Sequence, residues 1–499
     1  MVTLVILDGF GLSKKKFGNA IASAGTPNLD KLLKLYPHTV LEASGEAVGL
    51  DKGTMGNSEA GHLALGCGRA ILQDLKLIDS EIKNGNFYKN HALHKAMQHA
   101  VKNKSNLHIM GILSDGRVHS DIAHLFAILD IAKEYKIKNI YIHAFTDGRD
   151  CGMKSAKTYI DMLERRIQGT NAQIGTVIGR VYLDRELNYQ RVKVMYDMLV
   201  NGKGEKVATA TEAVDLSYSR GITDEFIEPF VIIKDAKVID NDSLIFYDYR
   251  TDREREITYA FTDPNFKEFK AHKFKNLLYT PMTKYADDLG HLNIVFPPKI
   301  IEDNLAAVLS RNGKTQFHIA ETTKYMHVTY FFNGENDTPY KGEERKLIDT
   351  IETDDYAQYP KMRALEITEA TLDAIASQKY DFIVVNYSNP DMVGHTGNFN
   401  AAKEAVACVE KQAYALALAT IMAGGDCIIT ADHGNAELMI DDKGNKVTTH
   451  TTNPVQLILA SEKNKKLRLK KHGTIANVAP TVLKLLGLDI PNCMEKPLF

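Results

Sequence analysis

The chain has 499 residues, of which 44% are hydrophobic and 25% charged, an ordinary balance for a globular protein long enough to form two or three domains. Its formal net charge of −2 argues against a dedicated nucleic-acid or membrane-surface binder, because such proteins need clustered positive charge to hold phosphates. Five scattered cysteines without a C-x-x-C pair exclude a disulfide framework and a zinc ribbon, and they favour a reducing, cytoplasmic compartment.

No signal peptide and no membrane span are expected. The apolar run in MVTLVILDGFG is short and lacks a basic start, and no uncharged apolar run of about 18 residues occurs. The basic stretches near Lys14 and Lys465 are short and typical of a solvated surface. We therefore expect neither a nucleic-acid partner nor a membrane partner.

Strand-like and helix-like segments alternate along the chain. Strands are predicted at 2–7, 106–113, 139–145, 380–388, 426–431 and 455–460. Helices are predicted at 26–36, 124–135, 154–167, 400–424 and 474–488. The strand segments are apolar throughout rather than alternating, which is typical of strands buried on both faces of a parallel sheet. Helices between such strands predict an α/β fold with right-handed crossovers.

One internal break separates the middle of the chain from its end. Pro297 and Pro298 lie between an apolar segment and a helix-like segment. A Pro-Pro pair cannot continue a strand ladder, and it stiffens a linker. If this pair marks a boundary, the middle of the chain is one domain inserted into another.

Acidic and histidine side chains follow short apolar segments at several places. In CIITADHGNAE, Asp432 and His433 come directly after a predicted strand, where open α/β sheets usually bind ligands. A carboxylate and a neutral imidazole both suit a divalent cation, whereas the alternative is a turn capped by Asp with a solvated His. The same pattern recurs with Asp8 in LVILDGFG, Asp391 and His395 in NPDMVGHTG, and His450 in VTTHTTNP. This set suits two metal ions better than one.

Ser58 lies between Gly56 and Gly61, ahead of a helix-like segment. At a helix N-terminus, its oxygen would lie in a positive field that stabilises a bound phosphate. The alternative is an ordinary N-cap serine. No Ser-His-Asp spacing, Walker loop or G-x-G-x-x-G stands out, so we predict that Ser58 is a nucleophile activated by metal ions.

The middle of the chain is rich in arginine, the side chain suited to bidentate binding of carboxylate and phosphate. The candidate residues are His119, Arg149, Asp150, Arg180, Arg185, Arg250 and Arg253. The alternative for this set is surface salt bridges with the many nearby acids. Lys324, just past a predicted strand, is either a surface lysine or a positive charge aimed at a transferring phosphoryl group.

Ten motifs in order along the chain carry a resemblance to a known family. They are ILDGFG, TPNLDKL, MGNSEAGH, SDGRVHSD, FTDGRD, YRTDR, AETTKYMHVTYFFNG, NPDMVGHTGN, TADHGNAE and HTTNPV. With these motifs, the whole chain resembles the 2,3-bisphosphoglycerate-independent phosphoglycerate mutases of the alkaline-phosphatase superfamily. The resemblance implies interconversion of 3-phosphoglycerate and 2-phosphoglycerate, in glycolysis and gluconeogenesis, through a phosphoserine at Ser58.

The resemblance also implies roles for the candidate residues. One metal ion would be held by Asp8, Ser58, Asp432 and His433. The second would be held by Asp391, His395 and His450. The metals are typically manganese, in some members magnesium or others. The arginine-rich set would bind the phosphoglycerate, Asp150 would move protons on its hydroxyls, and Lys324 would sit by the phosphoryl group.

The fold implied by the resemblance is an alkaline-phosphatase-like parallel-sheet domain, residues 1–72 and 299–499, split by an inserted α/β substrate-binding domain, residues 73–298. A monomer is the family expectation. The segment from Arg180 to Arg185 is one residue shorter than the family pattern, so Arg191 is an alternative to Arg185. DGFG and RTDR replace the family's usual DGWG and RPDR.

Two other functions remain open from the sequence. A metal-dependent phosphatase or a phosphopentomutase could use the same core, although the inserted arginine-rich segment favours the glycerate mutase. A metal-storing or carboxylate-binding protein could keep the ligands without turnover, but storage needs no nucleophile such as Ser58.

Overall fold

The computed structural model describes residues 1–298 and 301–499. The chain forms two compact units, one from Met1–Gln73 with Ile300–Phe499 and the other from Asp74–Lys299. The first unit is therefore discontinuous in sequence and the second is inserted into it. The boundary expected after Pro298 adjoins residues 299–300, which lie outside the described part of the chain.

The first unit contains an eight-stranded sheet in the order β11-β10-β12-β1-β13-β14-β2-β15. Its strands are β1 (Val2–Leu7), β2 (His38–Glu42), β10 (Gln316–Glu321), β11 (Glu343–Ile348), β12 (Phe382–Tyr387), β13 (Asp426–Thr430), β14 (Val455–Ala460) and β15 (His472–Thr474). The five strands from β11 to β13 are mutually parallel. β14 runs antiparallel to β13 and β2, a direction that its uniformly apolar sequence does not reveal.

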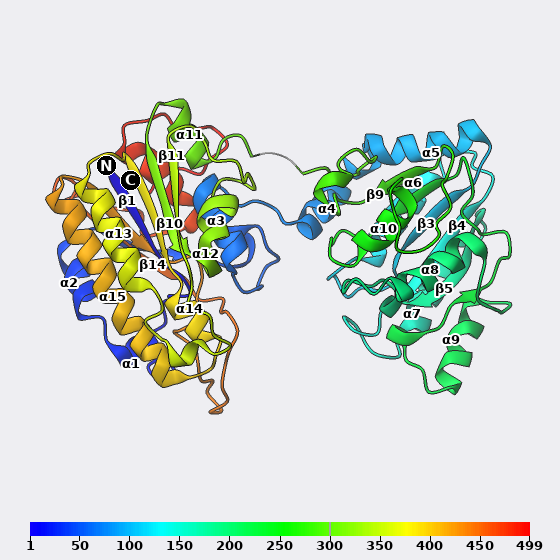
Figure 1. Ribbon diagram of the computed structural model, residues 1–499, viewed down its shortest axis with the longest axis horizontal. Helices are drawn as coiled ribbons and strands as arrows, with labels where there is room; N and C mark the ends of the chain where they lie inside the picture. The colour runs from blue at the N-terminus through cyan, green and yellow to red at the C-terminus, as the bar shows by residue number, and fades with distance from the viewer. Residues whose placement is uncertain (299–300) are drawn as a thin grey trace. The chain divides into compact units, whose positions relative to one another are not determined.

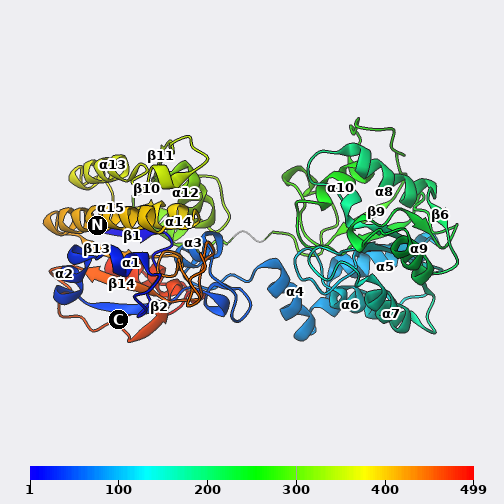
Figure 2. The ribbon, with the colours of Figure 1, turned by 90° about the horizontal axis from the view of Figure 1, so that it is seen from below.

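Helices cover both faces of this sheet. They are α1 (Ala20–Ala24), α2 (Pro27–Leu35), α3 (Ser58–Cys67), α11 (Leu305–Arg311), α12 (Thr322–Met326), α13 (Ala364–Ala376), α14 (Asn389–Gly394), α15 (Phe399–Met422) and α16 (Val478–Leu485). Leu4 and Ile6 of β1 pack with α3, α11 and α16, whereas Val5 and Leu7 pack with α2, α13 and α15. α13 and α15 lie side by side in Figure 1 and Figure 2. Because both faces are covered, the central strands β1, β10, β12 and β13 are buried at every position, whereas the strands β11, β2 and β15 are partly exposed.

The inserted unit contains a seven-stranded sheet in the order β6-β7-β5-β4-β3-β8-β9, parallel except for the β5–β7 pair. Its strands are β3 (Leu107–Ile112), β4 (Ile140–Thr146), β5 (Ala172–Gly179), β6 (Glu205–Lys206), β7 (Phe230–Val231), β8 (Ser243–Phe246) and β9 (Leu278–Pro281). Its helices are α4 (Asp74–Lys83), α5 (His91–Asn103), α6 (Ile122–Ala132), α7 (Ala156–Ile167), α8 (Tyr189–Asn201), α9 (Ala210–Ser219) and α10 (Glu254–Thr262). The predicted α/β class, with one parallel-sheet domain inserted into another, is confirmed.

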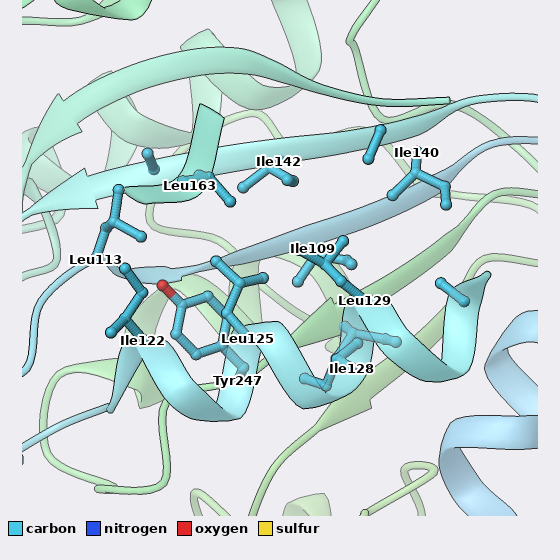
Figure 3. Close-up of a cluster of buried hydrophobic side chains, with 14 of the residues drawn as sticks. Ile109, Leu113, Ile122, Leu125, Ile128, Leu129, Ile140, Ile142, Leu163 and Tyr247 are labelled. Carbon is cyan, nitrogen blue, oxygen red and sulfur yellow. The ribbon is translucent and has the colours of Figure 1, made fainter. Parts of the chain in front are cut away.

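The core of the inserted unit has two layers, one on each face of the sheet. Leu125 and Leu129 of α6 pack against Ile109 of β3 and Ile142 of β4, as Figure 3 shows. On the opposite face, α8 and α10 pack against Met110. Burying each such side chain stabilises the fold by about 1.5–3 kcal/mol.

α15 is the one helix in the described residues that is long and apolar enough to cross a membrane by length and composition. Half of its apolar window is buried within the first unit, where it packs against β13, α13 and α2. It also carries the charged pair Lys403 and Glu404 near its start. These features are those of a core helix.

Gly66 of α3 lies directly against the backbone of Phe332, just after a turn of π-helix, η6 (His327–Phe331). A Cβ at Gly66 would lie 1.9 Å from the Phe332 carbonyl oxygen. The close approach therefore requires a glycine although its backbone is ordinary α-helix.

Gly66→Ala should destabilise the first unit. Alanine gains up to about 1 kcal/mol in helix propensity, but overpacking against fixed backbone costs about 1–3 kcal/mol, so we expect a net loss in urea unfolding. Gly290→Ala is the control, because its Cβ would meet no atom closer than 3.6 Å. A Gly66→Ala protein as stable as the wild type would contradict the close packing of α3.

Glu321 ends β10 and occupies the N-cap position of the short helix α12 without a capping hydrogen bond from its side chain, which is fully buried. Its Oε1 accepts the Arg363 backbone N–H at 3.0 Å, while Oε2 has no hydrogen-bond partner. Burial raises the pKa of Glu321 to about 7 because the charged form is poorly solvated.

Glu321→Gln should therefore change stability in a pH-dependent way. A raised pKa in the folded state means that the stabilisation from the protonated acid is complete below about pH 4.3, the unfolded value, and is lost as pH rises through 7. We expect the stability of the variant relative to wild type to increase by on the order of 2–3 kcal/mol between pH 5 and pH 8. Urea unfolding in the presence of a chelator measures this difference. Glu404→Gln, at an exposed position of α15, is the control, and a pH-independent difference for Glu321→Gln would refute the assignment.

Candidate functional site

The carboxyl ends of β1, β10, β12 and β13 meet at one edge of the first sheet, because these strands are parallel neighbours. The predicted residues of this unit converge there. Asp8 follows β1, Lys324 lies in α12 after β10, Asp391 lies in α14 after β12, and Asp432 and His433 follow β13. Asp432 and His433 are both fully buried, so the alternative of a solvated turn is wrong.

Ser58 is the first residue of α3, and Asn57 caps the helix by accepting the Ala60 N–H at 2.8 Å. The alternative in which Ser58 itself is the N-cap is therefore wrong. With the cap supplied by its neighbour, the Ser58 hydroxyl points to other groups: His433 Nε2 at 2.9 Å and Asp8 Oδ1 at 3.3 Å. It lies at the positive end of the helix dipole.

Lys324 is only 4% exposed, so it is not a surface lysine. Its ammonium donates to Ser58 Oγ at 2.6 Å, Asp391 Oδ2 at 2.7 Å and Asp8 Oδ1 at 2.8 Å. Burial by itself would lower the pKa of Lys324, but attraction to Asp8 and Asp391 raises it above the ordinary value. A permanent positive charge thus touches the candidate nucleophile.

Three buried carboxyl groups surround this one ammonium. Burial and repulsion from Asp432 raise the pKa of Asp8. Burial by itself would raise the pKa of Asp391 and of Asp432 as well. Attraction to Lys324 nevertheless holds the pKa of Asp391 well below its usual range, and attraction to His433 lowers the pKa of Asp432. The site therefore holds more negative charge than Lys324 balances, and it favours cations.

The three predicted histidines share one arrangement. Nδ1 of each faces a backbone carbonyl: Thr448 at 2.8 Å from His395, Gly56 at 2.9 Å from His450, and Gly434 at 3.3 Å from His433. A hydrogen bond from Nδ1 fixes the tautomer in which Nε2 carries a lone pair. Metal-ligating histidines commonly have this pattern.

The Nε2 atoms converge on the carboxylates. Asp391 Oδ1 lies 3.2 Å from Nε2 of both His395 and His450, and these two nitrogens are 2.9 Å apart. Asp391 and His395 lie one helical turn apart, because α14 begins with Pro390 in its first turn and continues to Gly394. The Asp391–His395 spacing therefore brings both side chains to one face. Hydrogen bonding to Asp391 raises the pKa of His395.

Two compact groups of ligand atoms result, each with its atoms within 4.8 Å of one another. One is formed by Asp391, His433 and His450, the other by Asp8, His62 and Asp432. His433 Nε2 is also 3.3 Å from Asp432 Oδ2 and 3.5 Å from Asp8 Oδ1, so it faces both groups. Asp432 Oδ2 is buried without a hydrogen-bond donor. Carboxylates, imidazole lone pairs and excess negative charge fit divalent metal ions.

His62 and Asn386 belong to this site although the sequence analysis did not select them. His62 Nδ1 lies 2.8 Å from the Ser58 carbonyl and 3.3 Å from Asp432 Oδ2. Asn386 Nδ2 lies 3.0 Å from His62 Nε2 and donates to Asp8 Oδ2 at 2.8 Å. The pair therefore orients both carboxylates. The sequence feature that could have identified His62 is its position one helical turn after Ser58.

The inserted unit brings its predicted residues together in a second cluster. Arg180, in the short helix η3 (Arg180–Tyr182), is 1% exposed, and Arg253 is 6% exposed. Arg180 Nη1 donates to Asp147 at 2.5 Å and also to Asp150. Arg253 Nη1 donates to the Leu183 carbonyl at 2.9 Å. These two arginines are not surface salt bridges.

Arg149, Arg185 and Arg250 are exposed, and Asp150 is half-buried. Asp252 accepts Arg185 Nη1 at 2.9 Å, and it lies 3.2 Å from Arg250 Nε and 3.5 Å from His119 Nδ1. His119 is itself buried and lies 3.1 Å from Glu254 Oε1. Arg149 forms an ion pair with Glu225 at 3.2 Å.

The Arg253 guanidinium lies beside other guanidinium groups and donates to a backbone carbonyl rather than to a carboxylate. Burial and repulsion from Arg180 and Arg185 lower the pKa of Arg253, and the Nε atoms of Arg180 and Arg253 have no hydrogen-bond partner. Buried guanidinium groups that repel one another favour an anion. Arg185 is one of the guanidinium groups that repel Arg253. Arg191, on α8, instead forms an ion pair with Asp184 at 3.2 Å.

Comparison with known proteins identifies a family. A sequence model described as the BPG-independent PGAM N-terminus matches residues 78–287. The chain is 45% identical to a 2,3-bisphosphoglycerate-independent phosphoglycerate mutase of Clostridium botulinum, over 99% of this chain and 98% of that protein. It is also 45% identical to the protein of that name from Clostridioides difficile, with the same coverage.

A solved structure is similar over the full length. It is the phosphoglycerate mutase of Leishmania mexicana, determined at low cobalt concentration, with 31% sequence identity and a TM-score of 0.64. The match covers 100% of this chain and 97% of that one. The chain therefore belongs to the family of 2,3-bisphosphoglycerate-independent phosphoglycerate mutases.

Proposed function

We propose that this protein interconverts 3-phosphoglycerate and 2-phosphoglycerate through a phosphoserine at Ser58, with two divalent metal ions, typically manganese. The observation that carries the proposal is the Ser58 hydroxyl, 2.6 Å from the Lys324 ammonium and 2.9 Å from His433 Nε2, among three buried carboxyl groups. A metal-storing protein has no need of such a hydroxyl.

One metal ion is assigned to Asp8, Ser58, Asp432 and His433 and the other to Asp391, His395 and His450, as the family resemblance implies. Bound divalent ions supply Lewis acidity, which stabilises the serine oxyanion and the charge on a transferring phosphoryl group. His433 Nε2 lies 3.5 Å from Asp8 Oδ1 and 3.3 Å from Asp432 Oδ2, which supports its assignment with these two carboxylates.

The residues of the chain perform the transfer in two displacements. Ser58 Oγ, in its deprotonated form, attacks the phosphorus of 3-phosphoglycerate, and the ester bond to the glycerate O3 breaks as Asp150 gives O3 a proton. Lys324 stabilises charge on the phosphoryl oxygens throughout. The glycerate O2 then gives its proton to Asp150 and takes the phosphoryl group from Ser58, which yields 2-phosphoglycerate and returns Ser58 to its deprotonated form.

The arginine-rich residues are proposed to bind the substrate: His119, Arg149, Asp150, Arg180, Arg185, Arg250 and Arg253. Guanidinium groups suit the carboxylate of phosphoglycerate. Asp150 accepts a hydrogen bond from Arg180, which supports a carboxylate able to take and return a proton of the glycerate hydroxyls. Under this proposal, the inserted unit, expected at 73–298, is the substrate-binding domain, and the enzyme is a cytoplasmic monomer.

Conversion of 3-phosphoglycerate without added 2,3-bisphosphoglycerate tests the reaction. Activity should disappear with a chelator, return with Mn²⁺ and fall at least about 10³-fold in Ser58→Ala, because no other group replaces the nucleophile. Rapid quenching of the wild type should trap phosphate on Ser58. Release of inorganic phosphate without isomerisation would point instead to the phosphatase alternative.

Comparing Arg185 with Arg191 tests the assignment of the substrate arginines. Arg185→Ala should lower kcat/KM about 10–100-fold, mainly through KM, because a charge-assisted hydrogen bond contributes about 1.5–3 kcal/mol. Arg191→Ala is the matched control and should stay within about 2-fold. The reverse order of the two effects would assign the substrate contact to Arg191.

A further inference from the structure

Three loops at the carboxyl edge of the first sheet carry the predicted metal ligands. They are residues 8–11 with Asp8, residues 431–437 with Asp432 and His433, and residues 448–453 with His450. The side chain of Glu437 lies among all three loops and is 1% exposed. It is neither one of the predicted ligands nor part of the transfer chemistry.

Glu437 accepts hydrogen bonds that join two of the loops. Oε2 accepts the Asn435 backbone N–H at 2.8 Å within its own loop. Oε1 accepts the Asn453 side-chain amide at 2.9 Å and the Thr451 hydroxyl. Thr451 directly follows His450, and its backbone N–H donates to the Gly434 carbonyl at 3.0 Å, next to His433. The Glu437 carboxylate thus links the loop that carries His433 to the loop that carries His450.

Glycines on two sides make room for this carboxylate. A Cβ at Gly11 would lie 2.2 Å from Glu437 Cδ. A Cβ at Gly434 would lie 2.3 Å from both Glu437 Oε1 and Thr451 Oγ1. The loop that begins with Asp8 therefore packs on the same side chain, and all three ligand-bearing loops touch Glu437.

The donors to Glu437 are neutral, and it forms no ion pair within residues 1–298 and 301–499. A buried carboxylate with only neutral donors is costly unless every oxygen is satisfied. Its three hydrogen bonds restrict the positions of Asn435, Thr451 and Asn453, and through them the backbone that carries the histidines.

We propose that Glu437 is a positioning residue for metal binding, which sets the separation of the His433 and His450 imidazoles. The inference rests on the proposed function only in taking these histidines as metal ligands. Residues behind metal ligands typically change metal affinity about 10–100-fold when they are replaced.

The test compares Glu437→Ala with Glu437→Gln. Alanine removes all three acceptors. Glutamine keeps the length, its Oε1 can accept from Asn435, and its amide can donate to Thr451 Oγ1 and to Asn453 after rotation of that amide. A positioning role predicts that Mn²⁺ binding, measured by calorimetry, weakens about 10–100-fold in the alanine variant and recovers to within about 3-fold in the glutamine variant. The visible absorption of bound Co²⁺ should shift in the alanine variant and return in the glutamine variant.

Glu410→Ala is the matched control. Glu410 is also 1% exposed, and it accepts two hydrogen bonds from Asn28, which join α15 to α2 away from the site. It should lower thermal stability but leave Mn²⁺ affinity within about 2-fold. If Glu437→Ala does not fold, Asn453→Ala removes one donor without changing the charge and should weaken Mn²⁺ binding about 3–10-fold.

Several outcomes would overturn the inference: unchanged Mn²⁺ affinity in Glu437→Ala, a glutamine variant as weak as the alanine variant, or wild-type protein that binds no Mn²⁺. The second outcome would mean that the negative charge, not the position, matters. Wild-type protein that binds Mn²⁺ but does not isomerise 3-phosphoglycerate would refute the proposed function and leave the inference about Glu437 standing.

Discussion

The parallel pairing of β10, β12, β1 and β13 is the constraint on which the rest of the first unit depends. Parallel strands end at the same edge of a sheet, so residues more than 300 positions apart in the chain, such as Lys324 and Asp8, come within hydrogen-bond distance. Because helices cover the sheet on both sides, both faces of these strands are buried. The parallel pairing therefore explains the location of the polar site.

Placing the polar site at this edge of the sheet costs electrostatic free energy, because the carboxyl groups of Asp8, Asp391 and Asp432 are removed from water close to one another. Lys324 offsets part of the cost by touching two of them, and the backbone N–H groups of Gly9 and His433 donate to the third, Asp432, at 3.2 and 3.0 Å. The remaining imbalance is what makes the site suitable for divalent cations.

The cluster in the inserted unit is built around arginines rather than around carboxylates. Arg180 and Arg253 are buried and repel each other, whereas Arg180 and Arg185 form ion pairs with Asp147 and Asp252. Under the proposed function, the first unit supplies the site for cations and phosphoryl transfer, and the arginines of the inserted unit bind the anionic groups of the substrate.

The sequence alone determined the α/β class and the apolar central strands, because these depend on local patterns. A buried strand followed by Asp432 and His433 likewise indicated the edge of the sheet at which polar side chains gather. The sequence could not reveal the antiparallel direction of β14, or the two-residue strands β6 and β7, because direction and pairing are set by distant neighbours. His62, Asn386 and Glu437 were not selected for the same reason, since each acquires its role from partners such as Asp432, Asp8 and Asn453. Only the structure decided between the alternatives for Ser58 and Lys324. Asn57 caps the helix that Ser58 begins. The Lys324 ammonium is buried because it donates to Asp8, Ser58 and Asp391.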